Sequence, residues 1–155
     1  MIRILSLKAE PSDEVYRGLL DYSLTKCIFA LLVVRRNLGL TDPGKRLLND
    51  LEPFLDAREE TSTWPGTQLI GQTAIVCRFK LVRASVSILQ NAANRLFEWR
   101  QPALPEDLCL MRQADDPWLV SISHENDAYL RASESEWKEL CEVLPGIDVS
   151  VDSRP

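Results

Sequence analysis

The single histidine of this chain stands among carboxylates. His124 ends an apolar run that begins at Trp118, and Glu125 and Asp127 follow it closely. An imidazole beside a carboxylate can act as a general base or bind a metal ion. A zinc-protease helix would require a second histidine four residues further on, and that position holds Ala128. The local sequence therefore assigns no reaction to His124.

Two interpretations of His124 remain. Neighbouring residues of an extended chain point to opposite faces, so Glu125 is poorly placed to orient His124. Asp127, across the expected turn, is better placed. We expect His124 to bond backbone groups of that turn, as polar turn residues commonly do. The alternative is a small enzyme that uses His124 and Asp127, with or without a metal ion.

Carboxylates recur at the loop ends expected in the last part of the chain. There are six of them: Glu106, Asp107, Asp115, Asp116, Glu125 and Asp127. Carboxylates from adjacent turns can converge on Mg²⁺ or Ca²⁺, but the spacing of a calcium loop is absent. The simplest interpretation is a solvated acidic rim, because charged side chains usually face water. The more informative interpretation is that these carboxylates form a docking surface for a basic partner protein. We expect no metal ion and no cofactor.

The charge distribution favours such a partner surface. Residues 1–99 carry 11 acids and 13 bases, whereas residues 100–155 carry 12 acids and 5 bases. An acidic surface attracts basic partners and repels nucleic acid. Trp64, in the turn Trp64-Pro65-Gly66, is the tryptophan best placed to be exposed and to anchor an interface. The favoured alternative is that it closes over the core from its loop, because large aromatic side chains dominate core burial. The predicted partner-binding residues are Glu106, Asp115, Asp116, Glu125, Asp127 and Trp64.

Several functional classes lack support. The sequence contains no glycine-rich phosphate loop, dinucleotide fingerprint or nucleophile elbow. No signal peptide is expected, and the longest apolar run, 27–34, is too short to span a membrane. The four cysteines lie in apolar stretches and are expected to be buried reduced thiols of a cytoplasmic protein.

We therefore expect a non-catalytic, acidic protein-binding protein, of the immunity-protein or antitoxin type, that inhibits a basic partner protein. The enzyme built on His124 is the alternative. A subunit that oligomerises around Trp64 is a third possibility, and the sequence does not determine the oligomeric state.

The periodicity predicts an α+β fold, with about four helices packed on a largely antiparallel sheet of about five strands. Residues 1–146 are expected to form one domain, with a subdomain seam at 100–105, and 147–155 a tail that is loose or forms a last short strand. The run 27–34, apolar at every position, predicts a central strand buried on both faces. A continuous helix over 13–36 is its competitor.

The remaining pattern is more regular. Helical spacing is found from 42 to 55, with a break expected at Pro53, and from 84 to 99. Residues 58–66 are expected to form a loop, and 71–82 alternate like a strand. Ser133 and Glu136 fit a capping box that begins the last helix. These elements would position the turns that carry the candidate residues.

Overall fold

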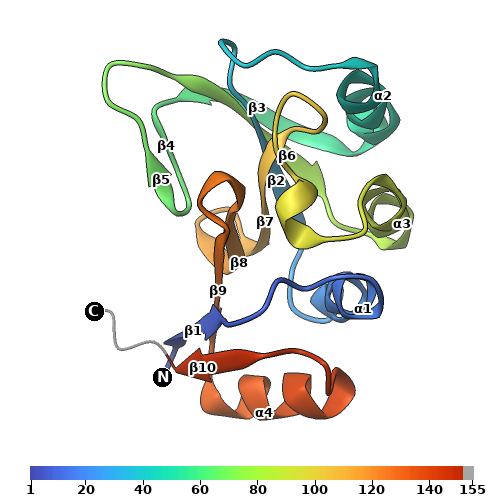
Figure 1. Ribbon diagram of the computed structural model, residues 1–155, viewed down its shortest axis with the longest axis vertical. Coiled ribbons are helices and arrows are strands. Elements are labelled where there is room, and N and C mark those ends of the chain that lie inside the picture. The colour runs from blue at the N-terminus through green and yellow to red at the C-terminus, as the bar shows by residue number, and fades with distance from the viewer. Residues whose placement is uncertain (152–155) are drawn as a thin grey trace.

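A computed structural model of the protein describes residues 1–151 (Figure 1). Its elements follow one another in this order: β1 (Arg3–Leu7), α1 (Glu14–Ser23), β2 (Phe29–Val34), α2 (Asp42–Leu51), the 3-10 turn η1 (Glu52–Phe54), β3 (Leu55–Thr61), β4 (Thr63–Trp64), β5 (Thr67–Gln68), β6 (Ala74–Lys80), α3 (Arg83–Ala92), the 3-10 turn η2 (Leu96–Glu98), β7 (Glu106–Gln113), β8 (Asp116–Ile122), the 3-10 turn η3 (Ser123–Glu125), β9 (Asp127–Ala132), α4 (Glu134–Val143) and β10 (Val149–Val151). The expected α+β class is confirmed.

One large sheet organises the molecule. Its eight strands lie in the order β10-β1-β9-β8-β7-β2-β6-β3, and every neighbouring pair is antiparallel. The expectation of about five strands was therefore too low. Helices α1, α2 and α3 lie side by side along one face, and α4 lies at the end of the sheet near β10 (Figure 1). Strand β2, which precedes residues 100–105, pairs directly with β7, which follows them.

The strand interpretation of residues 27–34 is confirmed, and the competing helix over 13–36 is wrong. Helix α1 ends at Ser23, and β2 then runs between β6 and β7. Ala30 and Leu32 join the main core under the helices, whereas Leu31 and Val33 pack on the opposite face of the sheet. Burial on both faces explains why no polar position interrupts this run.

A small hairpin covers part of the face that carries no helices. Strands β4 and β5 pair with each other, and Pro65-Gly66 forms the turn between them. Gly66 has φ +85°, which glycine adopts without strain. A Cβ built on Gly66 would lie 2.8 Å from Val120 Cγ1 and 2.9 Å from Ile122 Cγ1. The hairpin tip therefore rests directly on β8, and only glycine allows this approach.

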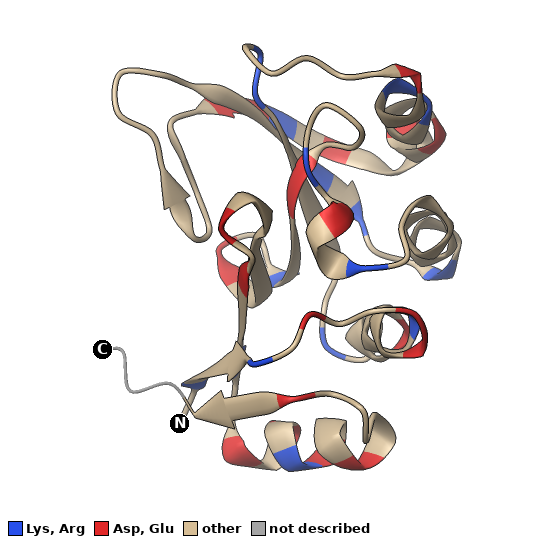
Figure 2. Ribbon diagram, in the orientation of Figure 1, with Lys and Arg blue, Asp and Glu red and all other residues tan. Residues whose placement is uncertain are grey.

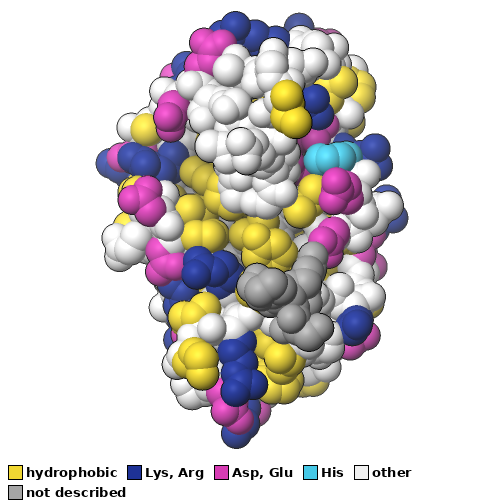
Figure 3. Space-filling model, turned by 90° about the vertical axis from the view of Figure 1, so that its left-hand side faces the viewer, with side chains coloured by type: hydrophobic (Ala, Val, Ile, Leu, Met, Phe, Trp, Pro, Cys, Tyr) yellow, Lys and Arg dark blue, Asp and Glu magenta, His cyan; other side chains and the backbone are white. Residues whose placement is uncertain are grey.

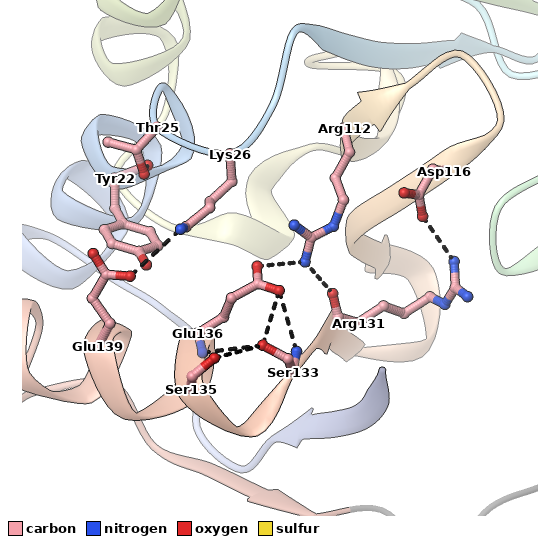
Figure 4. A network of polar contacts seen from close by, with 10 residues as sticks. All are labelled: Tyr22, Thr25, Lys26, Arg112, Asp116, Arg131, Ser133, Ser135, Glu136 and Glu139. Atoms are coloured by element: carbon pink, nitrogen blue, oxygen red, sulfur yellow. Dashed lines mark hydrogen bonds and ion pairs between the residues drawn. The ribbon is translucent and has the colours of Figure 1, made fainter. Parts of the chain in front are cut away.

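Helix α4 is joined to the sheet by polar contacts (Figure 4). The predicted capping box is present: Ser133 accepts a hydrogen bond from the Glu136 backbone, and Glu136 accepts one from the Ser133 backbone. The Glu136 carboxylate also contacts the Arg112 guanidinium at 2.7 Å. Arg112 in turn donates to the carbonyl of Arg131, whose side chain lies 3.4 Å from Asp116. These contacts join α4 to β7, β8 and β9.

Two elements differ from the sequence-based expectation. The segment 58–66 is not a loop, since residues 55–61 form the edge strand β3. Its polar sequence shows no alternation, and its pairing with β6 outweighs local preference. The helix expected over 84–99 ends at Ala92. The next segment is extended and bonds to residues near α1, where Asp13 N–H donates to Asn94 C=O and Leu96 N–H to Pro11 C=O.

The remaining expectations concern the tail and the thiols. Residues 149–151 form the short strand β10 against β1, and the last part of the predicted tail, 152–155, lies outside the described residues. All four cysteines are free thiols; Cys27, Cys77 and Cys109 are buried and Cys141 is half-buried. Within residues 1–151, no helix has the length and apolar character needed to cross a bilayer.

Candidate functional site

The structure brings His124 against two acidic residues that begin β7. His124 Nδ1 lies 3.7 Å from Glu106 Oε2 and 3.9 Å from Asp107 Oδ1. These three residues are called the His124 cluster below. Antiparallel pairing of β7 with β8 places the start of β7 beside the end of β8, where η3 carries His124. The contact is therefore a consequence of strand pairing and not of local sequence.

Asp107 is the most buried member of the cluster. Its exposed fraction is 0%, and its φ of +57° lies in the left-handed region, which aspartate tolerates better than most residues. Its carboxylate accepts hydrogen bonds from Trp64 Nε1 at 3.2 Å and from the Ser123 backbone N–H at 2.9 Å. Asp107 thus joins the β4–β5 hairpin and η3 to β7.

Glu106 is also buried, with an exposed fraction of 3%. Its Oε1 accepts a hydrogen bond from the Gln101 backbone N–H at 3.2 Å. Its Oε2, on the side of His124, is buried and has no hydrogen-bond partner among the described residues. A buried carboxylate oxygen without a hydrogen bond is costly and therefore uncommon.

Burial raises the pKa of both acids. For Glu106, desolvation is the main cause, and the neighbouring charge of Asp107 raises the pKa further. For Asp107, desolvation again raises the pKa, against the hydrogen bonds from Ser123 and Trp64. The charges of His124 and Arg35 act in the opposite direction on both carboxyls. Burial thus disfavours ionisation of both carboxyls unless a positive charge lies close to them.

His124 connects the buried acids with solvent. Its side chain is 35% exposed, and the histidine is visible at the edge of the face shown in Figure 3. Its Nε2 lies 3.9 Å from Glu125 Oε1. The 3-10 turn brings Glu125 near His124, but the separation is longer than a hydrogen bond, so Glu125 does not orient the imidazole by one. The predicted pairing of His124 with Asp127 stays a prediction.

A second feature, the open-face pocket, lies on the face of the sheet that carries no helices. Its volume is about 340 Å³. Leu31, Val76 and Met111 contribute apolar side chains from three adjacent strands, and Trp64 lines it from the hairpin. Figure 3 shows hydrophobic side chains gathered in the middle of this face. The size and the apolar floor suit a ligand or an inserted side chain.

The charges that line this pocket are mostly negative. Glu59 of β3 and Asp115 of the β7–β8 turn are both exposed, and neither forms an ion pair with another described residue. Arg78 also lines the pocket, but its guanidinium contacts Asp56 at 2.8 Å and lies over the ring of Phe29. The unbalanced charge of the pocket therefore comes from the two carboxylates.

Trp64 connects the two features. The exposed fraction of Trp64 is 6%, which confirms its interpretation as a loop residue that closes over the core and contradicts its exposure as a surface anchor. The indole lines the open-face pocket, while its N–H donates to Asp107 of the His124 cluster. The expected exposed position of Glu106 is wrong for the same reason: both side chains are buried where the hairpin and η3 close over the start of β7.

The predicted acidic residues do not form one surface. Asp115 precedes β8 and Asp116 begins it, whereas Glu125 and Asp127 follow it. A strand of seven residues separates the two pairs by about 20 Å. Asp116 faces Arg131 (Figure 4), and acidic and basic positions are interspersed over the whole molecule (Figure 2). Only Asp115 of this set lines the open-face pocket, together with Trp64.

Glu59 is the residue that sequence reasoning missed. It stands in the polar segment expected to be a loop, and its place opposite Val76 of β6 follows from the pairing of β3. Comparison with known proteins adds no assignment: no family model matches the chain, and neither a curated protein nor a solved structure does.

Proposed function

We propose that the protein is a cytoplasmic, non-catalytic binding protein that takes a basic partner protein on the open face of its sheet, in the manner of an immunity protein or antitoxin. One observation carries this proposal. A pocket of about 340 Å³ with apolar side chains on its floor is bordered by two exposed carboxylates, Glu59 and Asp115, that have no ion-pair partner in the described part of the chain.

The chemistry of the pocket favours an arginine or lysine side chain as its occupant. The aliphatic stem of such a side chain packs on apolar surface while its charged head stays near polar groups. Leu31, Val76 and Met111 offer the apolar surface, and the two carboxylates offer partners for the head. Arg78 does not oppose this arrangement, since Asp56 balances its charge at 2.8 Å.

The net charge of the protein supports the same partner. A charge of -5 attracts a basic protein over a distance comparable to the Debye length, about 10 Å at 0.1 M salt. Such attraction raises the rate of association more than the final affinity. A partner that inserts one basic side chain gains the specific contact from the pocket and the fast approach from the overall charge.

The test uses a defined probe before any lysate. A capped peptide with one arginine between two leucines is titrated into the ¹⁵N-labelled protein, with the same peptide carrying citrulline as the uncharged control. We expect shifts at Leu31, Val76 and Met111 with the arginine peptide only. Binding should weaken at high salt and in the double variant Glu59→Gln/Asp115→Asn.

The matched control is Glu14→Gln/Glu142→Gln, which removes two exposed carboxylates from α1 and α4. Equal weakening of peptide binding by the two double variants would show that net charge alone acts and would contradict binding at the pocket. Affinity capture with the same variants then identifies the partner protein. This partner should be basic, and Glu59→Gln/Asp115→Asn should no longer capture it.

A second candidate, a small enzyme, is favoured by the contact of His124 with two buried carboxylates. An imidazole between an exposed surface and buried acids suits general acid–base chemistry. If the protein is such an enzyme, His124→Ala abolishes turnover of its substrate while Glu59→Gln/Asp115→Asn does not. Turnover that survives His124→Ala would exclude this function.

A further inference from the structure

We propose that the His124 cluster binds one divalent transition-metal ion, with His124 Nδ1, Glu106 Oε2 and Asp107 Oδ1 as its protein ligands. The inference is independent of partner binding at the open-face pocket. The three residues each offer one ligand atom, and these atoms all lie within 4.8 Å of one another.

The distances between the ligand atoms suit a shared ion. Nitrogen and oxygen ligands lie about 2.0–2.2 Å from Zn²⁺, so two ligands of one ion are roughly 3–4 Å apart. The observed separations from His124 Nδ1 are 3.7 Å to Glu106 and 3.9 Å to Asp107. Both are longer than a hydrogen bond, as expected of groups that face a common third partner.

An independent observation points to the missing partner. Glu106 Oε2 is buried, has no hydrogen-bond partner among the described residues and lies on the His124 side of the carboxylate. Folding places two carboxylates here at 3% and 0% exposure, where a charge is costly unless a positive partner lies beside it. A divalent ion would offset both negative charges and would occupy the free oxygen.

The surrounding contacts hold the ligands in place. Gln101 N–H bonds the other oxygen of Glu106, and Trp64 bonds the other oxygen of Asp107. Glu125 Oε1 lies 3.9 Å from His124 Nε2, the nitrogen that points away from the acids. This distance exceeds a hydrogen bond, so Glu125 adds negative charge near the imidazole without bonding it.

The ligand set indicates the class of metal. One imidazole and two carboxylates suit Zn²⁺, Mn²⁺ or Fe²⁺, whereas Ca²⁺ and Mg²⁺ prefer oxygen ligands alone. Three protein ligands leave a coordination position open. The His124 side chain is 35% exposed, so solvent reaches this edge of the cluster and can supply water or a small anion as a further ligand.

Zn²⁺ alone serves as the probe. The full chain is freed of metal with a chelator, which is then removed, and Zn²⁺ is titrated by isothermal calorimetry, with Ca²⁺ and Mg²⁺ as comparison ions. We expect one Zn²⁺ per chain. His124→Ala and Glu106→Gln should each weaken Zn²⁺ binding by a factor of ten or more, and Glu125→Gln by a smaller factor.

Two control variants separate this site from other sites. Cys141→Ser removes the one thiol that is not fully buried, and Glu59→Gln/Asp115→Asn removes the pocket carboxylates; neither should alter Zn²⁺ affinity. Circular dichroism verifies that each variant folds. Absence of saturable Zn²⁺ binding to the folded wild type would overturn the proposal. Zn²⁺ binding unchanged by His124→Ala and Glu106→Gln, or a preference for Ca²⁺ or Mg²⁺, would do the same.

Discussion

The His124 cluster and the open-face pocket place the same functional group in opposite settings. In the cluster, Glu106 and Asp107 are buried, and burial raises the pKa of both. In the pocket, Glu59 and Asp115 are exposed and have no ion-pair partner among the residues described. Buried carboxylates are costly to keep and gain from a partner at short range. Exposed carboxylates cost little and attract a partner from a distance.

The comparison shows that the position of a carboxylate in the sheet decides what it can do. Glu106 and Asp107 stand where the hairpin and η3 close over the start of β7. Glu59 stands on the edge strand β3, which among the described strands pairs only with β6. Trp64 belongs to both regions, because it lines the pocket and bonds Asp107. Perturbing Trp64 should therefore affect the two regions together, whereas other changes should separate them.

Trp64→Ala should have the largest effect. The change removes a buried indole and leaves Asp107 without one of its donors, and we expect a loss of about 3–5 kcal/mol in the free energy of unfolding. Trp64→Phe keeps the ring and removes the N–H, with an expected loss of about 1–3 kcal/mol. Urea unfolding followed by circular dichroism measures both. A Phe variant as stable as the wild type would show that the bond to Asp107 does not couple the regions.

Gly66→Ala should separate the hairpin from β8. The alanine would have to adopt φ +85°, and its Cβ would lie 2.8 Å from Val120 Cγ1. Left-handed strain and overpacking together should cost about 2–4 kcal/mol. Gly71→Ala is the matched control, because Gly71 has φ +72° but no atom within 4 Å of a Cβ. Thermal unfolding of the two variants distinguishes crowding from strain, and equal losses would argue against tight packing of the hairpin.

Glu136 is a carboxylate in a third setting, and its substitution should cause a smaller loss of stability. Burial would raise its pKa, but the contact with Arg112 and the hydrogen bonds from Ser133 lower the pKa by more. The unfolded chain thus binds the proton more readily. Glu136 contributes its whole stabilisation of the folded state above the ordinary glutamate pKa, about 4.3. This contribution is lost as the pH falls through the lowered pKa of the folded state.

Glu136→Gln should therefore reduce the free energy of unfolding by about 1–2 kcal/mol at neutral pH. The difference from the wild type should shrink as the pH falls below about 4. Urea unfolding over a pH series measures it. Glu134→Gln on the same helix changes an exposed pair with Lys138 and should shift stability by no more than about 0.5 kcal/mol. A difference that stays constant with pH would contradict the assigned ion pair.

The smallest effect on stability is expected at the pocket. Glu59→Gln and Asp115→Asn change exposed groups without ion-pair partners, so each should alter the free energy of unfolding by less than about 0.5 kcal/mol. The same variants should nevertheless weaken binding of the arginine peptide. Chemical denaturation and peptide titration on one preparation test both statements. A large loss of stability would mean that these carboxylates serve the fold.

Local patterns in the sequence determined much of the fold. The unbroken apolar run at 27–34 predicted a central strand, and Ser133 with Glu136 predicted the start of α4, because both signals depend on neighbouring residues. The α+β class followed from the same periodicities. The sequence also singled out His124 and Glu106, and it placed Asp115 in a turn.

Only the tertiary structure decided how these residues combine. Pairing of β7 with β8 brings Glu106 and Asp107 to His124 and separates Asp115 from Glu125 by the length of a strand. Pairing with β6 turns the polar segment 55–61 into a strand and brings Glu59 to the pocket. Closure of the hairpin buries Trp64. Contacts of this kind join residues far apart in the chain, and neither hydrophobic period nor turn chemistry encodes them.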